Sequence, residues 1–444
     1  MLNPNTHICI LGGGFGGLYT ALYLQRFSGL KKCRVTLVDP KQHFLFTPLM
    51  YELVTGELQQ WEIAPSFHSL LQGTHVKHRR DTVETVDLGE RRVKLQSGKS
   101  LTYDYLVLAV GKETDLGAVP GAAEHAYPFR TLADAQHLRE QLRFLEASER
   151  QQIRIAIVGG GPSGVELAGK LADRLQKRGQ IRLIDRGDDI LKSFSRASRI
   201  TAYRTLGAKG VQVDLHTSIA EIGADWIAVK TQGEASRIGI DLVLWTTGNQ
   251  PIEWIRNLEC DRNSQDQLIA HPTLQLQGYP EVFVLGDLAD VRNARGQQVP
   301  ATAQVAYQQA DCAAKNLWAI LQNRRPKPFR YLHLGEMITL GTDAAAVFSF
   351  GMSLRGRLAC MVRRLVYLQR LPTLRHRLRV IKHQLTRWLP GKKSKSLQRA
   401  ANSSAPTGVG QTHSTQRGTA SVRSEPIDLE KSAWRSPDKK QINR

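Results

Sequence analysis

The 444-residue chain lacks the paired cysteines and long apolar runs that identify several common classes of protein. Its five cysteines are scattered, none forms a C-x-x-C pair, and no metal site is predicted, so a reducing compartment is expected. No apolar run approaches the roughly 18–20 residues that a membrane-spanning helix requires. The first residues lead into a strand without the pattern of a signal peptide. We therefore expect a soluble or peripheral protein.

Acidic residues are absent from one long stretch, residues 351–390. Lysine and arginine number 61 against 40 acids, which gives a net charge of +21. Residues 351–444 carry 21 of the bases and only 4 of the acids, so the rest of the chain is nearly neutral. A basic end on a neutral body favours an anionic surface as partner, either lipid or nucleic acid.

A glycine pattern follows the first apolar strand, at residues 7–11. Gly12, Gly14 and Gly17 fit G-x-G-x-x-G, and the next strand ends in Asp39. Glycines in these places allow a tight turn, close approach of a pyrophosphate and packing of helix on strand. The helix N-terminus offers free N–H groups to the phosphates. A carboxylate at Asp39 is placed to accept hydrogen bonds from ribose hydroxyls. The pattern predicts a dinucleotide site.

The same pattern recurs with Gly159, Gly161 and Gly164, and its following strand ends in Asp185. Two such units predict two nucleotide sites in one chain. A carboxylate at Asp185 favours NADH because it would repel a 2′-phosphate. Arg186 follows directly and could soften that preference, so the choice between NADH and NADPH stays open.

Three further glycines end apolar strands. Gly111 follows the strand that closes the first unit, and Gly248 follows the matching strand of the second. Gly286-Asp287 follows the strand at 282–285, and in two-nucleotide flavoproteins such a pair lies near the ribityl and phosphate portion of FAD. An aspartate that caps the next helix is the plainer interpretation of Asp287.

The expected fold is α/β, with two Rossmann-like domains, C-terminal amphipathic helices and a disordered tail; a resemblance of these features to the glutathione-reductase-like flavoproteins implies that the two domains are of that type and bind FAD and NAD(P)H. The expected division is 1–115 (first part of the FAD domain), 116–265 (NAD(P)H domain), 266–350 (second part of the FAD domain), 351–390 (basic helices) and 391–444 (disordered basic tail).

These features together resemble the glutathione-reductase-like flavoproteins. Within them, Ala303 to Gln309 is similar to the A-Q-x-A-x-Q-Q signature of type II NADH:quinone dehydrogenases, and so is Pro162 to Gly169, with Glu166 in the family position. The resemblance implies FAD as cofactor, NADH or NADPH as co-substrate and a quinone as acceptor. It also places Glu166 and Gln304 where flavin, nicotinamide and quinone meet.

Finer features resemble the branch found in cyanobacteria and plastids. They are His43 to Leu53, Trp61 to Pro65, Gly335 to Gly341 and Leu368 to Pro372. That branch acts on prenylated quinones, so demethylphylloquinone on the path to vitamin K1, or plastoquinone, is the implied substrate. Two features depart from the family pattern: Asp185 replaces the Glu of many relatives, and the tail beyond residue 390 has no match.

Plainer interpretations of the two predicted catalytic residues remain. Gln304 could be a helical glutamine that satisfies a buried backbone group. Glu166 could be a solvated helix residue.

Leucines recur at helical spacing in two basic stretches that Pro372 separates. The apolar positions are Leu354, Leu358, Met361, Leu365 and Leu368, then Leu374, Leu378, Ile381, Leu385, Trp388 and Leu389, with Arg355, Arg363, Arg364 and Arg370 among the first set. This pattern is typical of helices that lie in a membrane interface; packing on the protein's own core is the alternative. We expect a peripheral protein on the cytoplasmic side of a membrane, thylakoid or plasma membrane in a phototroph. A homodimer is compatible with the sequence.

Two other functions fit less well. A sulfide:quinone reductase needs cysteines beside the flavin, and Cys312 has no evident partner. A non-enzymatic binder of nucleic acid would explain the charge, but the chain lacks interleaved aromatic residues and the glycine patterns would then have no purpose. We therefore expect no nucleic-acid partner.

Overall fold

The computed structural model describes residues 5–293 and 295–388. Two sheets dominate the unit formed by Met1–Gln384, and the first is parallel except at β19, which pairs antiparallel with β18 and β20. The first has the order β21-β18-β19-β20-β7-β1-β2-β3. Its strands are β1 (His7–Leu11), β2 (Arg34–Val38), β3 (Val76–Arg79), β7 (Tyr105–Leu108), β18 (Leu268–Ala270), β19 (Gln275–Leu276), β20 (Tyr279–Val284) and β21 (Ala289–Val291). Residues 7–108 and 268–291 thus share one sheet.

The second sheet has the order β12-β11-β10-β16-β9, and all its pairs are parallel. Its strands are β9 (Ala126–Pro128), β10 (Ile153–Val158), β11 (Gly179–Ile184), β12 (Gln212–Asp214) and β16 (Leu242–Trp245). The central strands of both sheets are buried apolar runs, as expected for parallel strands covered on both faces. The second sheet is inserted between the two parts of the first. The α/β fold with two Rossmann-like units is confirmed.

The remaining strands form four smaller sheets among the described residues. They are β4 (Val83–Asp87), β5 (Arg92–Leu95) and β6 (Ser100–Thr102); β13 (Thr217–Ile222), β14 (Trp226–Thr231) and β15 (Glu234–Gly239); β22 (Glu336–Thr339), β23 (Ala345–Ser349) and β24 (Met352–Arg355); and the pair β8 (Glu113–Thr114) and β17 (Asn249–Gln250).

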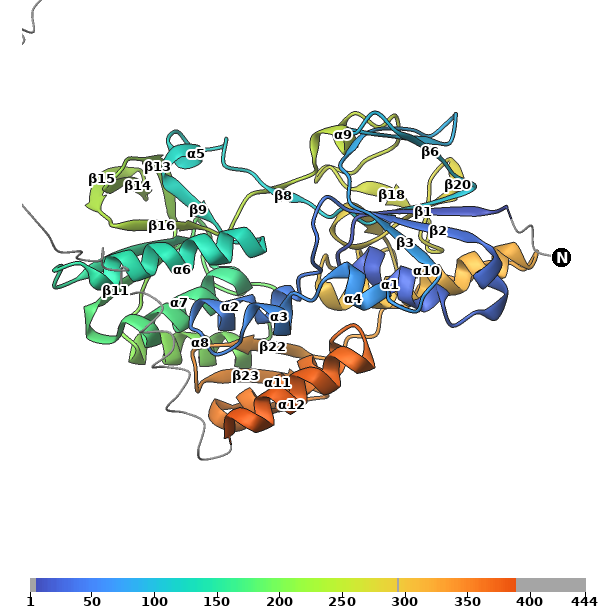
Figure 1. Cartoon of the computed structure of the whole chain (residues 1–444). Helices are drawn as coiled ribbons and strands as arrows, with labels where there is room; N and C mark the ends of the chain where they lie inside the picture. Colours follow the sequence, from blue (N-terminus) through green and yellow to red (C-terminus); the bar gives the residue numbers. More distant parts are fainter. Residues whose placement is uncertain (1–4, 294, 389–444) are drawn as a thin grey trace, which may run out of the picture. The chain divides into compact units, whose positions relative to one another are not determined.

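The helices follow the strands in the order that βαβ units require. They are α1 (Phe15–Leu24), α2 (Met50–Val54), α3 (Gln60–Ile63), α4 (Phe67–Leu71), α5 (Ala122–His125), α6 (Leu132–Ala147), α7 (Pro162–Leu175), α8 (Arg196–Ala208), α9 (Glu253–Arg256), α10 (Ala303–Leu321), α11 (Gly356–Arg370) and α12 (Leu374–Trp388). Figure 1 shows α1 and α10 side by side against the first sheet, and α6 and α7 beside the second. None of the described helices is long and apolar enough to cross a bilayer.

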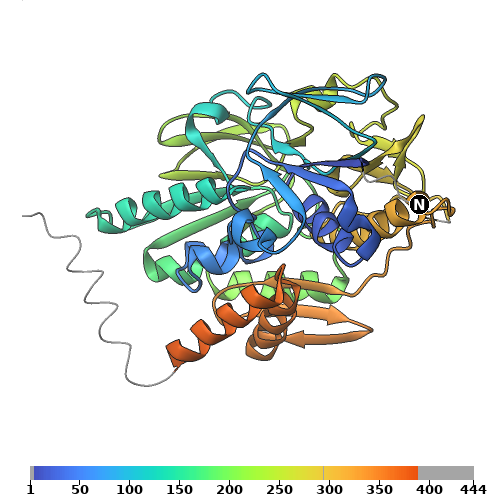
Figure 2. The same cartoon turned by 45° about the vertical axis from the view of Figure 1, so that its right-hand side comes forward.

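The sheet β22–β24 carries α11 along β23, and it also contacts α7 and α8. Figure 2 shows this sheet with α11 and α12 on the same side as α8. Two expectations for this region need correction. Leu354 lies in β24, not on a helix, because it pairs with Val347 of β23. Arg363 is 2% exposed and cannot contact a membrane surface. The break expected at Pro372 is confirmed, since α11 ends at Arg370 and α12 begins at Leu374.

The expected boundary at residue 350 falls in the turn between β23 and β24. The expected disordered tail, 391–444, lies outside the described residues, as does the end of the expected interface segment, 389–390.

Candidate functional site

The first glycine turn is fixed by its own backbone and by Asp39. Gly12 has φ +96°, and a Cβ there would lie 2.5 Å from the carbonyl oxygen of Ala109, so the position requires glycine. A Cβ at Gly17 would collide with the carbonyl oxygen of Gly12. The buried Asp39 carboxylate accepts the N–H of Gly13 at 2.6 Å. The turn is therefore held in one shape at the C-terminal edge of the sheet.

The second turn repeats this geometry. Gly159 has φ +113°, and a Cβ at Gly164 would collide with its carbonyl oxygen. The carboxylate of Asp185 accepts the N–H of Gly160 at 2.6 Å and that of Gly187 at 2.6 Å. Both predicted ribose acids thus also brace the glycine turn beside them, a role that the sequence spacing did not reveal.

The middle glycines of the two motifs, Gly14 and Gly161, face open space. A Cβ at either position would meet no atom within 4 Å, although the flanking glycines are tightly packed. Each is the N-cap of its helix and carries no side-chain cap, so the N–H groups of the first turn are available, from Phe15 in α1 and from Ser163 in α7, where Pro162 has none. An open cradle with free N–H groups and a positive helix end suits a pyrophosphate. The residues therefore fit two dinucleotides.

The remaining predicted cofactor positions lie at strand ends. Gly111, Gly248 and Gly286 all have positive φ, 69°, 70° and 72°, a conformation that glycine adopts without strain. β7 and β16 end shortly before the first two of these glycines. The observed strands, β7 and β16, are therefore shorter than the strands that the runs at 106–111 and 242–248 predicted.

Asp287 does not cap a helix. It lies in a short 3-10 turn at Gly286–Leu288, and its carboxylate accepts from Arg130 at 3.2 Å. Arg130 also donates to Asn249 at 2.8 Å, so it connects the second unit to the first beside the predicted flavin position. Gly286 donates its N–H to the side chain of Gln309 at 2.7 Å. Arg130 and Gln309 were missed, although Gln309 belongs to the signature that we quoted.

Glu166 lies on α7 and is 6% exposed, which excludes a solvated helix residue. Its carboxylate accepts the N–H of Thr339 at 3.0 Å and a guanidinium N–H of Arg363 at 3.3 Å. Burial raises the pKa of Glu166 to about 7, and Arg363 offsets only part of that increase. A carboxyl group with this pKa can hold or release a proton near neutral pH.

Arg363 forms the centre of a buried ionic cluster. It pairs with Glu52 of α2 as well as with Glu166 of α7, and it donates to the carbonyl oxygen of Pro48 at 2.7 Å. Lys170, 1% exposed, lies 3.8 Å from Glu52 and pairs with Glu57. Buried charges require such partners because unpaired ions are costly away from water.

The pKa of Glu52 shows how strong this pairing is. Burial alone would raise the pKa of Glu52, but the charges of Arg363 and Lys170 outweigh burial and lower it below its ordinary value. Glu52 therefore stays ionised while Glu166, in the same cluster, titrates near neutrality. Glu52 was part of a quoted segment, but nothing in the sequence singled out Arg363 among its neighbouring arginines.

Gln304 lies at the start of α10 and is partly buried. Its Oε1 accepts from the hydroxyl of Tyr331 at 2.6 Å and from the N–H of Leu334 at 3.3 Å, and its Nε2 lies 3.5 Å from the carbonyl oxygen of Gly335. Gln304 thus makes the hydrogen bonds to backbone groups that its plainer interpretation requires. These bonds do not test its predicted role at the quinone.

Gln304 and Glu166 hold opposite ends of β22. Gln304 contacts Gly335, just before the strand, and Glu166 contacts Thr339, its last residue. Four residues of strand span roughly 13 Å, so the backbone groups that the two side chains contact lie about that far apart.

Each of the five cysteines is free. Cys312 lies on α10, where its thiol contacts the carbonyl oxygen of Lys327, and no second thiol joins it among the described residues. The described residues also contain no cluster of side chains suited to a metal ion. Disulfide and sulfide chemistry therefore have no support at the site.

Comparisons with known proteins agree with this geometry. The family model described as pyridine nucleotide-disulphide oxidoreductase matches residues 6–310. A demethylphylloquinone reductase from Synechocystis sp. is 46% identical over 404 residues, which cover 89% of this chain and 100% of that protein. An alternative NAD(P)H-ubiquinone oxidoreductase C1, chloroplastic/mitochondrial, from Arabidopsis thaliana is 39% identical, with 85% of this chain and 80% of that protein covered.

A solved structure shares the fold at lower identity. It is that of NDH2 from Plasmodium falciparum in complex with NADH, with a TM-score of 0.77 and 19% identity, and it covers 86% of this chain and 98% of the other.

Proposed function

The chain belongs to the pyridine nucleotide-disulphide oxidoreductase family as an FAD-dependent NAD(P)H:quinone oxidoreductase, and we propose that it delivers electrons to a prenylated quinone at a membrane surface. Demethylphylloquinone is the proposed acceptor, with plastoquinone as the alternative, because the relative at 46% identity is a demethylphylloquinone reductase. The observation that carries the proposal is the pair of equivalent glycine turns, each braced by a carboxylate at 2.6 Å and each open at its middle glycine.

We assign the first turn to FAD and the second to NAD(P)H. Gly12, Gly14 and Gly17 would hold the FAD pyrophosphate, with Asp39 at its ribose, and Gly111 and Asp287 would lie further along the cofactor. Gly159, Gly161 and Gly164 would hold the nicotinamide nucleotide, with Asp185 and Gly248 beside it. The flavin supplies the capacity to accept a hydride from NAD(P)H and to pass two electrons to a quinone.

In this reaction the chain itself positions the reactants, excludes water from them and supplies protons. Arg130 bonds to both Asp287 and Asn249, so it connects the two nucleotide units beside Gly286 and Gly248, two of the glycines assigned to the cofactors. Glu166 is the group proposed to hold the proton that quinone reduction consumes, because its pKa is raised to about 7 by burial. Gln304 is proposed to border the quinone from the other end of β22.

The helices α11 and α12 support the membrane part of the proposal. Several of their apolar side chains are exposed: Leu358 57%, Met361 68%, Leu365 58%, Leu374 68% and Leu378 56%. Apolar side chains exposed beside arginines, with no acid on either helix, suit an anionic bilayer. The opposite side of α11 packs on the protein through Ala359 and Arg363, so α11 is no detachable anchor. Attachment to the cytoplasmic side of a thylakoid or plasma membrane follows as the proposed location.

Anaerobic stopped-flow kinetics of the FAD-loaded protein test the function. NADH or NADPH should bleach the bound flavin, and a prenylquinone in vesicles should restore its colour. A water-soluble quinone serves as the control for access to the bilayer. Bound flavin that neither nicotinamide reduces would contradict the proposal. Light scattering on the same samples tests the hypothesis of a homodimer.

A further inference from the structure

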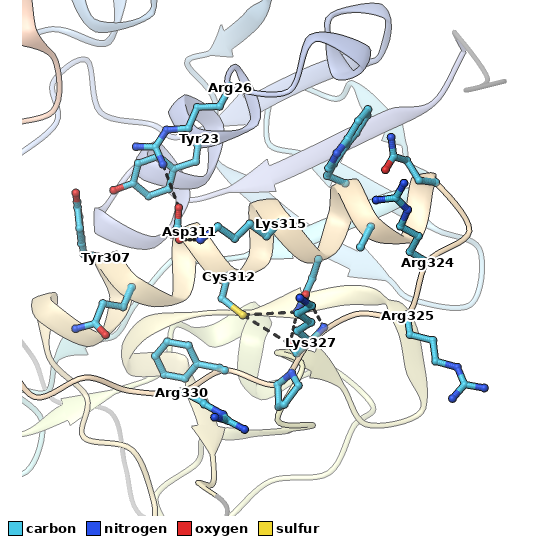
Figure 3. A pocket seen from close by; sticks show the side chains of 17 residues that line it. Tyr23, Arg26, Tyr307, Asp311, Cys312, Lys315, Arg324, Arg325, Lys327 and Arg330 are labelled. Carbon is cyan, nitrogen blue, oxygen red and sulfur yellow. Dashed lines mark hydrogen bonds and ion pairs between the residues drawn. The ribbon is translucent and has the colours of Figure 1, made fainter.

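A cavity of about 820 Å³ lies along α10, away from both glycine turns. Tyr307 and Gln322 mark its two ends on the helix, and the segment 324–330 forms its other wall. Its residues include none of those assigned above to FAD, NAD(P)H or proton transfer. Figure 3 shows α10 running along the cavity, with the basic segment beside it.

Positive charge dominates the lining. Six cationic side chains surround the cavity with a single carboxylate, Asp311, to balance them. Arg26 and Lys315 both pair with Asp311, at 3.1 Å and 2.6 Å, as Figure 3 shows. The other four cations, Arg324, Arg325, Lys327 and Arg330, have no acidic partner among the described residues.

The basic segment is held firmly by its backbone. Asn316 of α10, 2% exposed, accepts the N–H of Lys327 at 2.8 Å and donates to its carbonyl oxygen at 2.9 Å. The N–H of Phe329 donates to the carbonyl oxygen of Pro272 at 2.7 Å, and Phe329 itself is buried. Pro326 and Pro328 further restrict the chain. The backbone of this segment is therefore held in place, and the four cationic side chains that extend from it give this wall of the cavity a positive potential that attracts anions.

The lining suits a ligand with more than one negative charge, and its aromatic residues can also accept an apolar part. Arginine presents several N–H donors in a plane that matches phosphate oxygens, and three of the four unpaired cations are arginines. Tyr23, Tyr307 and Trp318 add aromatic surface to the same cavity. The volume is that of ordinary small-molecule sites.

We propose that this cavity binds a phosphate-bearing ligand, through Arg324, Arg325 and Arg330 on one wall and the aromatic side chains of α1 and α10 on the other. Two sources carry that chemistry: a soluble phosphate compound and the headgroup of an anionic phospholipid. The second is consistent with the position of the cavity beside α11, the helix proposed to contact the membrane, because Arg370 at the end of α11 lies 5.2 Å over the ring of Tyr307 at one end of the cavity.

The test compares two triple variants of the FAD-loaded protein, saturated with NAD⁺ so that the nucleotide site is filled. The site variant is Arg324→Gln, Arg325→Gln and Arg330→Gln. The control is Arg143→Gln, Arg204→Gln and Arg256→Gln, which removes the same charge from exposed positions that do not line the cavity. All six arginines are exposed, so both proteins should fold and retain flavin.

Binding is measured by calorimetry with inorganic pyrophosphate, and by co-sedimentation with phosphatidylcholine vesicles that contain or lack phosphatidylglycerol. If the source is soluble, pyrophosphate binds the parent protein and the control saturably, and the site variant binds it about tenfold more weakly or not at all. If the source is a lipid, pyrophosphate binds none of the proteins, and the site variant loses more affinity for the anionic vesicles than the control does. Equal behaviour of the two variants in both assays overturns the proposal.

Discussion

Arg363 of α11 and Glu166 of α7 form an ion pair of 3.3 Å in the interior of the protein, although 197 residues separate them in sequence. The same guanidinium pairs with Glu52, so one side chain compensates two buried carboxylates on two different helices. Removal of one partner of such a group is costly, because the charges that remain stay buried without compensation.

Arg363→Met should therefore destabilise the protein strongly. Loss of a buried ionic partner costs about 3–5 kcal/mol in the free energy of unfolding. Arg357→Met, on the same helix, is the matched control: its side chain is 85% exposed and its pair with Asp343 spans 3.6 Å, so stability should hardly change. Urea unfolding measures both.

A further variant separates charge from packing. Addition of Glu52→Gln and Glu166→Gln to Arg363→Met removes the uncompensated charges and should restore much of the lost stability. A combined variant that is less stable than Arg363→Met alone would show that the arginine acts through its contacts and not through its charge.

Glu166 should make stability fall as pH rises from about 4.5 to about 7. Burial raises its pKa from the ordinary value of 4.5 to about 7. Between these values the folded protein keeps a proton that the unfolded chain has released, so rising pH favours unfolding. Above about pH 7 both states are ionised and this contribution no longer changes. Urea unfolding at several pH values, with Glu166→Gln as the control, measures it.

The same group should set the pH dependence of quinone reduction. Reoxidation of reduced flavin by quinone should slow as pH rises through about 7, since Glu166 then loses the proton that it is proposed to supply. Glu166→Gln should be slower and should lack that inflection. An inflection that persists unchanged in the variant would assign it to another group.

Substitutions at the two middle glycines should separate the cofactors. Gly14 and Gly161 have φ of −74° and −72°, and a Cβ at either would meet no protein atom within 4 Å. Gly14→Val and Gly161→Val should therefore fold, and the new side chain should collide only with a bound pyrophosphate. We expect Gly14→Val to purify without FAD. Gly161→Val should keep its flavin and raise the KM for NADH by about tenfold or more.

Absorbance spectra and steady-state kinetics measure these effects, and each variant is the control for the other. Flavin loss from Gly161→Val with normal flavin in Gly14→Val would show that the two sites are assigned in the wrong order.

Gln304→Leu should slow the reoxidation of flavin by quinone and leave its reduction by NADH nearly unchanged. Gln304 is proposed to face the quinone, and hydride transfer from NADH would take place away from it. Tyr331→Phe removes the 2.6 Å hydrogen bond to the Gln304 amide but keeps the amide, so it tests for a merely structural effect. Stopped-flow traces of both half-reactions decide. Equal slowing of the two half-reactions in Gln304→Leu would indicate a packing defect.

The sequence predicted both nucleotide units because their signals are local. A strand, three glycines and a carboxylate lie within about 30 residues, and each glycine has a steric reason that holds in any protein with this turn. The ionic cluster gave no such signal. Arg363 lies in a run of arginines, and its burial depends on Glu52, 311 residues away in sequence. Leu354 was placed on a helix because its spacing matched, but pairing with Val347 across a hairpin overrides that spacing.

The exposed apolar face of α11 should hold the enzyme on vesicles. Met361 and Leu365 are one helical turn apart and are 68% and 58% exposed, so Met361→Ser with Leu365→Ser removes apolar surface without opening the core. Phe144→Ser with Ile200→Ser is the control, since these side chains are 72% and 38% exposed on α6 and α8. Burial of each apolar side chain in the acyl boundary contributes about 1–3 kcal/mol. The Met361→Ser, Leu365→Ser variant should therefore bind anionic vesicles at least about tenfold more weakly, with activity on a water-soluble quinone retained.

Salt should weaken the binding of the parent protein to anionic vesicles without abolishing it. The Debye length of about 8–10 Å at ordinary ionic strength means that salt screens the charges of the arginines but not the apolar contact. Equal binding by the two variants would place the membrane contact on another face.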